Sequence, residues 1–133
     1  MRTVDSRTLA RSGWAQTLDR VRAGESLAIL QRGKPAAVLL PFSVWERAAS
    51  ADPASEGEEA YPVPETAQQT YGSHEVRDNL RERREDSTFR NLHTLITWHG
   101  KQHSAPAPEV VMAPWDWTRK ALPTLGDIEP DAK

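Results

Sequence analysis

A short motif in the first third of the chain recurs in the last third, and this repeat limits the folds available to the sequence. Two apolar runs, Leu27–Leu30 and Ala36–Leu40, flank a polar stretch with Gly33 at its bend. This pattern predicts a β-hairpin. The stretch 29–34 (ILQRGK) recurs at 96–101 (ITWHGK), and the exit 38–42 (VLLPF) recurs at 111–115 (VMAPW). We therefore expect the hairpin twice, although a chance match of two glycine hairpins would give the same signal.

Helical patterns flank the first hairpin. A short strand is expected around Val4, and apolar residues spaced by four, four and three predict an amphipathic helix from Ser6, its expected N-cap, to Val21. Pro41 ends the hairpin, and Ser43 is expected to cap a short helix over 44–49. The residues expected to anchor the core or a dimer interface are Trp14, Leu18, Val21, Ile29, Val38, Leu40 and Trp45.

The second copy is less regular than the first. Aligning 10–14 (ARSGW) with 76–80 (VRDNL) places Arg84 and Ser87 where the first helix has Leu18 and Val21. We expect a one-residue shift that brings Phe89, Leu92 and Leu95 to the core instead. The second hairpin also carries a proline-rich insertion at 103–108.

Composition divides the chain into parts. Residues 1–50 carry eight Lys and Arg against four Asp and Glu, whereas 51–70 carry five acids and no base. We expect a module over 1–50, an acidic Pro/Ala/Glu linker over 51–69, a degenerate second module or a partner-binding region over 70–122, and a flexible tail over 123–133. With no cysteine and no long apolar run, a cytoplasmic protein that does not enter a membrane is expected.

The first third closely resembles the Phd/YefM family of type II antitoxins. The resemblance rests on Ser6 to Val21, the Ala-Gly-Glu-Ser stretch at 23–26, Ile29, the run 32–39 (RGKPAAVL), and Pro41 to Arg47. The second copy resembles the family more loosely. The resemblance implies an α+β fold made of β-α-α-β-β-α modules that dimerise, bind operator DNA, repress their own operon and neutralise a toxin protein.

Under this resemblance the family's helix arginine corresponds to Arg11, and to Arg77 in the second copy. The family's basic residue at the end of the first hairpin strand corresponds to Gln31 and Trp98, so both copies depart from the pattern. Arginine donates in a fork that suits phosphate and guanine. The expected DNA-binding residues are Arg2, Arg7, Arg11, Arg32, Lys34 and Arg77.

Three uses of the second copy remain open. In the first, the second copy forms an intramolecular pseudo-dimer with the first copy. In the second, the first copy forms a homodimer and residues 51–133, which include the expected toxin-binding region 70–122, contact the toxin. Alternatively, the chain is a stand-alone interaction or regulatory module without a toxin. A neighbouring gene for a small toxin would separate the first two from the third.

Other features predict no chemistry. His93, His99 and His103 lack acidic or cysteine partners at metal-ligand spacing, and Glu75 suits a first helical turn. Trp115 and Trp117 align with apolar positions of the first copy, and 81–86 (RERRED) is expected to form a solvated, ion-paired helix face. No nucleophile triad or phosphate loop is present, so we expect neither an enzyme nor a cofactor.

Overall fold

The first half of the chain follows the expected order of elements. In the computed structural model, which describes residues 1–49, 61–97 and 107–125, the chain starts with strand β1 (Arg2–Asp5) and enters a helical stretch. This stretch consists of α1 (Ser6–Thr8), the π-helical turn η1 (Leu9–Gly13) and α2 (Trp14–Arg22). The hairpin strands β2 (Leu27–Gln31) and β3 (Lys34–Pro41) follow, and α3 (Phe42–Ala49) ends the half.

The second half repeats this order. A 3₁₀ turn, η2 (Glu65–Ala67), leads into β4 (Gln68–Gly72), and two helices follow, α4 (Ser73–Asp78) and α5 (Leu80–Arg90). Strands β5 (His93–Thr97) and β6 (Pro108–Pro114) precede α6 (Trp115–Ala121) and the 3₁₀ turn η3 (Pro123–Leu125). The fold is therefore mixed α+β, as predicted. The second hairpin's bend, with Trp98, His99, Gly100 and Lys101, lies outside the described residues.

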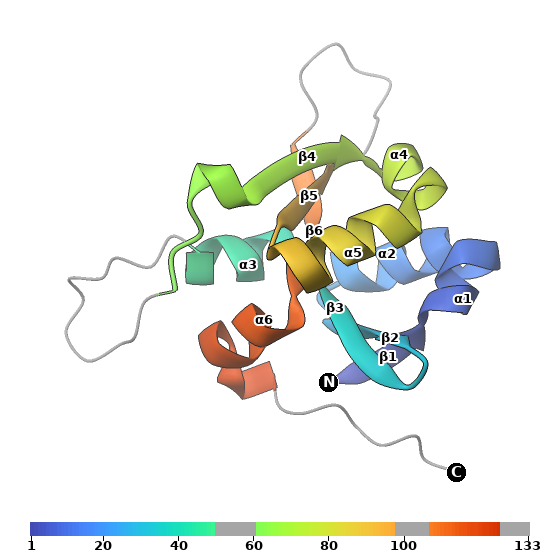
Figure 1. Cartoon of the computed structure of the whole chain (residues 1–133), viewed down its shortest axis with the longest axis horizontal. Helices are drawn as coiled ribbons and strands as arrows, with labels where there is room; N and C mark the ends of the chain where they lie inside the picture. The colour runs from blue at the N-terminus through green and yellow to red at the C-terminus, as the bar shows by residue number, and fades with distance from the viewer. Residues whose placement is uncertain (50–60, 98–106, 126–133) are drawn as a thin grey trace.

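All six strands form one open sheet in the order β1-β2-β3-β6-β5-β4 (Figure 1). The order is symmetric about the junction of β3 and β6, which pair antiparallel with Leu39 opposite Met112. Val38 pairs with Ala113 and Val111 pairs with Leu40, so each valine lies one residue before the central pair. The outer pairs β1–β2 and β4–β5 are both parallel. The two halves are thus related by an approximate two-fold axis through the middle of the sheet.

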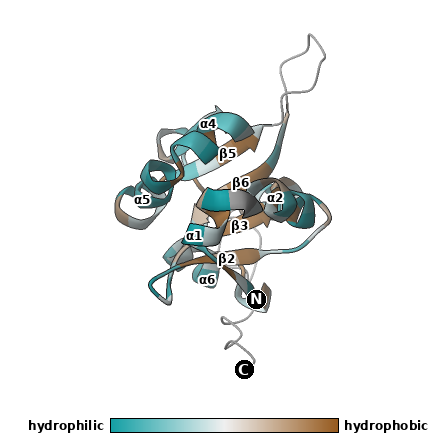
Figure 2. Cartoon of the chain, turned by 90° about the vertical axis from the view of Figure 1, so that its right-hand side faces the viewer, coloured by the Kyte–Doolittle hydropathy of each residue, from teal (hydrophilic) through white to brown (hydrophobic). Residues whose placement is uncertain are grey.

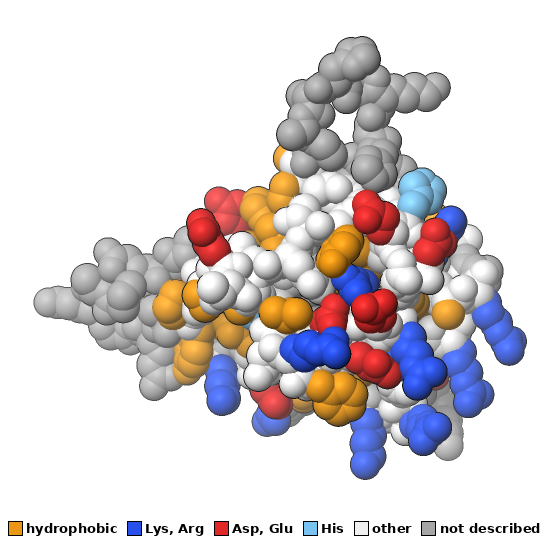
Figure 3. Space-filling view, turned by 45° about the horizontal axis from the view of Figure 1, so that its top comes forward, with side chains coloured by type: hydrophobic (Ala, Val, Ile, Leu, Met, Phe, Trp, Pro, Cys, Tyr) orange, Lys and Arg blue, Asp and Glu red, His pale blue; other side chains and the backbone are white. Residues whose placement is uncertain are grey.

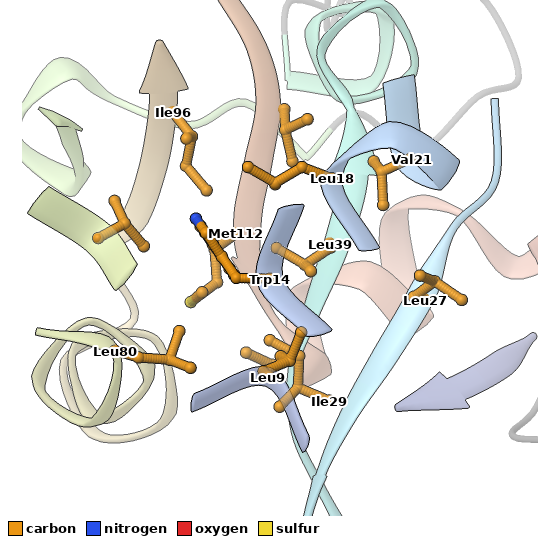
Figure 4. Close-up of a cluster of buried hydrophobic side chains, with 13 residues drawn as sticks. Leu9, Trp14, Leu18, Val21, Leu27, Ile29, Leu39, Leu80, Ile96 and Met112 are labelled. Carbon is orange, nitrogen blue, oxygen red and sulfur yellow. The ribbon is translucent and has the colours of Figure 1, made fainter. Parts of the chain in front are cut away.

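Successive side chains of the central strands point to opposite faces of the sheet, and this creates two cores, one on each face. Leu39 and Met112 face the helices α1 to α2, α4 and α5, together with Trp14, Leu18 and Ile96 (Figure 4). The opposite face is covered by α3 and α6. Its buried members include Val38, Leu40, Trp45, Leu95 and Val111. Both cores contain residues from both halves, so neither half has a complete core of its own.

All the residues expected to anchor the core are buried. The exposed fraction is 5% or less for Trp14, Leu18, Val21, Ile29, Val38, Leu40 and Trp45. Figure 2 shows the same separation, with apolar strands between helices whose outer faces are hydrophilic. Among the described residues, no helix is both long and apolar enough to cross a membrane.

The first hairpin turns at Arg32 and Gly33, which both adopt positive φ, 52° and 77°. Two consecutive left-handed residues are typical of the type I′ turn, whose twist matches that of the flanking strands. Glycine adopts this conformation without strain. The turn therefore holds the Arg32 side chain at the tip of the hairpin, beside the helical layer.

Two predicted helix boundaries are wrong. Asp5, not Ser6, caps the first helix, because Asp5 is extended and its carboxylate accepts a hydrogen bond from the Arg7 amide at 2.8 Å. The third helix starts at Phe42, before the expected cap Ser43. The expected single helix over 6–21 is also interrupted by the π-helical turn. A Cβ at Gly13 would lie 3.1 Å from the Thr8 carbonyl oxygen, a tight contact that glycine avoids.

The predicted linker and tail each contain ordered structure at one end. Val63 is buried, and its amide donates to the Ala49 carbonyl at 3.3 Å. Gln68 and Gln69, assigned to the linker, begin β4. Leu125, assigned to the tail, packs against the core of the α3 and α6 face. The remaining parts of both segments, 50–60 and 126–133, lie outside the described residues.

The expected shift of the second long helix is wrong for Phe89, which is 77% exposed, whereas Leu95 does lie in the core of the α3 and α6 face. Arg84 and Ser87 are themselves buried, at 6% and 0%. Two polar side chains on the inner side of the helix have partners nearby. The Ser87 hydroxyl donates to the Leu92 carbonyl at 2.9 Å, and Gln69 donates to Asp86 at 3.0 Å. Partners on α5 and β4 thus replace the apolar contacts that the pattern seemed to require.

His93 is buried in the core of the α3 and α6 face, 3% exposed. Its Nδ1 accepts a hydrogen bond from the Trp45 indole at 2.9 Å, and its ring meets that of Trp117 edge to face at 4.8 Å. Burial lowers the pKa of His93 from 6.5 to about 4. Protonation would remove the acceptor that Trp45 uses.

This arrangement predicts that acid destabilises the fold through His93. Because the folded pKa lies below the unfolded value, the stabilisation is complete above pH 6.5 and falls as the pH decreases toward 4. We expect the wild type to lose about 2 kcal/mol more than His93→Gln between pH 7.5 and 5. Urea denaturation at a series of pH values measures the difference. Identical pH profiles for the two proteins would contradict this role.

Candidate nucleic-acid interface

The helical stretch after β1 contains arginines but no acidic residue in its first eight positions. Residues 6–13 include Arg7 and Arg11 and no Asp or Glu. The short strand β1, paired with β2, fixes where this stretch begins, and Asp5 caps its first turn. Both arginines are exposed, and neither forms an ion pair with a described residue. A π-helical turn of the kind found at Arg11 occurs frequently at functional sites.

Arg11 and Arg77 border the same cleft between the two halves. This cleft has a volume of about 170 Å³, and its apolar wall includes Leu9, Trp14 and Leu18. The halves are joined there by the Trp14 indole, which donates to the Ser73 carbonyl at 3.0 Å. The structure therefore brings together the two arginines that the alignment assigned to one position in each copy.

A second, more open pocket of about 420 Å³ lies between α1, the β2–β3 turn and α5. Its charged wall consists of Arg7, Arg32, Arg81 and Arg84. Two of these arginines belong to the first half and two to the second. Arg7 and Arg32 were predicted to bind DNA, and the structure places them at one pocket.

The other two predicted DNA-binding residues lie outside both pockets. Arg2, on the edge strand, forms an ion pair with Glu25 at 3.6 Å, and Glu25 also pairs with Arg20 at 2.5 Å. The hydrogen bond from Arg20 is the main cause that lowers the pKa of Glu25. Lys34 starts β3, directly after the turn. The six predicted residues therefore divide into two pocket pairs, Arg7 with Arg32 and Arg11 with Arg77, and two separate positions.

Charge is distributed unequally between the halves. Helices α4 and α5, over 73–90, contain five arginines and five carboxylates. Arg77 pairs with Asp78 at 3.5 Å and Arg81 pairs with Glu85 at 3.1 Å. Figure 3 shows several Lys and Arg side chains projecting along the lower right rim, with Asp and Glu side chains over the middle of the view and at other places around it. An anionic partner would meet unpaired cations mainly on the first half.

Sequence reasoning missed Arg81 and Arg84. The run 81–86 was predicted to be a solvated helix face, and the Arg81–Glu85 pair agrees with that prediction. However, Arg83, Arg84 and Asp86 are buried at 8%, 6% and 4%, so the prediction is wrong for the inner side of the helix. The alignment of Arg84 with Leu18 was the available signal, because a position equivalent to a core leucine points inward.

The remaining candidates have structural contacts. Glu75 accepts from the Gly72 amide at 3.3 Å and so caps α4, as expected for a first-turn acid. Trp115 and Trp117 are half-buried against the α3 and α6 face, and the Trp117 indole donates to the Tyr61 carbonyl at 3.0 Å. His99 and His103 lie outside the described residues. Among the residues that are described, no three His, Asp or Glu side chains are placed to hold a metal ion.

A scan against models of known protein families found no match to this chain, and searches of characterised proteins and of solved structures found none either.

Proposed function

We propose that the chain is a DNA-binding repressor of the Phd/YefM antitoxin type in which the two halves take the places of the two subunits of a dimer. The observation that carries the proposal is the symmetric pairing of β3 with β6 around Leu39 and Met112. Two copies of a three-stranded module that pair edge to edge would form the same six-stranded order. Here one chain supplies both parts.

One face of the sheet is covered by α1, α2, α4 and α5 and is called the helical face below. Its chemistry supports nucleic acid as the partner. DNA-binding proteins neutralise phosphates with Lys and Arg and read base edges with a few side chains. Arg7, Arg11 and Arg32 have no carboxylate partner among the described residues and are exposed to solvent. The helices on the opposite face of the sheet, α3 and α6, carry Arg47, Arg119 and Lys120 together with the acids Glu46 and Asp116. The helical face is therefore the proposed DNA-binding side.

Neutralisation of a cognate toxin is part of the proposal, and it rests on the family resemblance. The expected toxin-binding region was 70–122. Its described residues, 70–97 and 107–122, belong to the shared sheet and the helices on it. A toxin would therefore bind to the folded surface or to segments outside the described residues.

The same observation favours a second candidate function, a stand-alone regulator without a toxin. Because the second copy completes the sheet, the chain has a use for it that involves no toxin. The product of the adjacent open reading frame distinguishes the two. We expect its expression to arrest growth and co-expression of this chain to restore growth, with the two proteins purifying together. If that product is harmless and does not bind, the stand-alone regulator is the correct function.

Arg11→Ala tests the proposed DNA-binding side. We expect weaker binding to a duplex from upstream of the protein's own gene, and a slope of log K against log salt that is smaller by about 1. Fluorescence anisotropy at several salt concentrations measures both quantities. Arg47→Ala is the matched control, because it removes the same charge from α3 on the other face of the sheet. Equal losses in the two variants, or no loss in Arg11→Ala, would show that the assigned side is wrong.

A further inference from the structure

Arg84 is a buried cation without a partner among the described residues. It is 6% exposed, and no described residue accepts a hydrogen bond from it or forms an ion pair with it. The other buried arginine of α5, Arg83, instead pairs with Glu82 at 2.9 Å and Asp86 at 3.3 Å. The guanidinium nitrogens of Arg84 are not among the buried atoms that lack a partner, so the charged end of this side chain reaches the pocket surface. An anion in the pocket would pair with a charge that no described carboxylate pairs with.

The residues around Arg84 add further positive charge. It lines the open pocket together with Arg7, Arg32 and Arg81, and Ser6 lies at the same wall. Burial lowers the pKa of Arg84; the Glu85 carboxylate opposes that effect and the Arg81 charge adds to it. Arginine still remains protonated at neutral pH. Four guanidinium groups therefore line one pocket, and Glu85 engages only Arg81 directly.

The counterpart of this pocket in the other half is the cleft bordered by Arg11 and Arg77, and its lining is different. Strand pairing makes Val4 equivalent to Tyr71, because their partners are Ile29 and Ile96. Arg7 lies two residues after the end of β1, and His74 lies two residues after the end of β4, so the two residues are equivalent. The helices α2 and α5 start at the equivalent buried residues Trp14 and Leu80, which matches Arg81 with Ala15 and Arg84 with Leu18. Among the described residues, four arginines therefore meet at one of these two related places and not at the other, although the fold is approximately two-fold symmetric.

We propose that this pocket is a binding site for a phosphate group, held by Arg84 from α5 together with Arg7 and Arg32 from the first half. Guanidinium groups bind phosphate through paired, charge-assisted hydrogen bonds, which are stronger than neutral ones. The pocket is open to solvent, so the phosphate can belong to a DNA backbone or to a free phosphate compound. The DNA source rests on the proposed function, whereas the free source does not.

The test uses two probes, inorganic phosphate and the duplex DNA described above. Wild type should bind inorganic phosphate saturably in isothermal titration calorimetry at low salt. We expect Arg84→Leu, which installs the residue of the other half, to weaken this binding at least tenfold, and Arg47→Ala to leave it unchanged. Circular dichroism establishes that the variants fold. If Arg84→Leu does not fold, Arg32→Asn tests the same pocket, because asparagine tolerates the positive φ of the turn.

The DNA probe identifies the source of the phosphate. Weaker duplex binding by Arg84→Leu, with competition by inorganic phosphate, places a DNA phosphate in the pocket. Loss of phosphate binding with unchanged duplex binding assigns the pocket to a free phosphate compound. If no duplex binds to wild type, the proposed function fails, and the calorimetric result still decides the pocket. The pocket proposal is overturned if Arg84→Leu matches wild type with both probes.

Discussion

The pairing of β3 with β6 is the interaction on which the rest of this structure depends. It joins two three-stranded units into one sheet and aligns their apolar positions on both faces. Leu39 and Met112 meet at its centre, fully buried, and each belongs to a core that includes residues of the other half. Three strands and three short helices provide too little apolar surface for a stable unit on their own. Pairing the two halves provides it.

The same symmetry makes differences between the halves informative. Where the first half places Leu18 against the sheet, the second places Arg84, and the cost of that change falls on α5. Some of it is offset locally, because Asp86 forms an ion pair with Arg83 and accepts a hydrogen bond from Gln69. Arg84 itself has no such partner among the described residues and lines the pocket proposed to bind phosphate. A duplicated module that keeps its shared sheet can thus acquire an asymmetric surface, since the sheet alone preserves the fold.

Much of this fold follows from the sequence. The hairpin, its turn at Arg32 and Gly33, and the apolar spacing of Trp14, Leu18 and Val21 predict their elements because each signal is local. The helix start was misplaced by one residue, because Asp5 and Ser6 are both good caps and only the backbone conformation chooses between them. The π-helical turn over Leu9–Gly13 was not predicted, because the apolar spacing does not distinguish a π turn from a continuous α-helix.

The site was less predictable than the fold. Arg7, Arg11 and Arg32 follow from their positions in a recognisable pattern, but the grouping of Arg7 and Arg32 with Arg81 and Arg84 requires the tertiary structure. The charged sequence of α5 resembles a solvated helix, and the burial of its inner side results from long-range packing on the sheet. His93 was likewise ambiguous, since a strand histidine becomes a core residue only when Trp45 and Trp117 surround it.

The central claim is that β3 and β6 of one chain pair with each other. A sample that mixes isotope-labelled and unlabelled protein tests it directly, because isotope-filtered nuclear Overhauser spectra separate contacts within a chain from contacts between chains. The account predicts backbone contacts between the neighbourhoods of Leu39 and Met112 within the labelled chain, and none between chains. Contacts from Leu39 to Leu39 or to Met112 of another chain would instead show a dimer formed between molecules, and would contradict the single-chain arrangement.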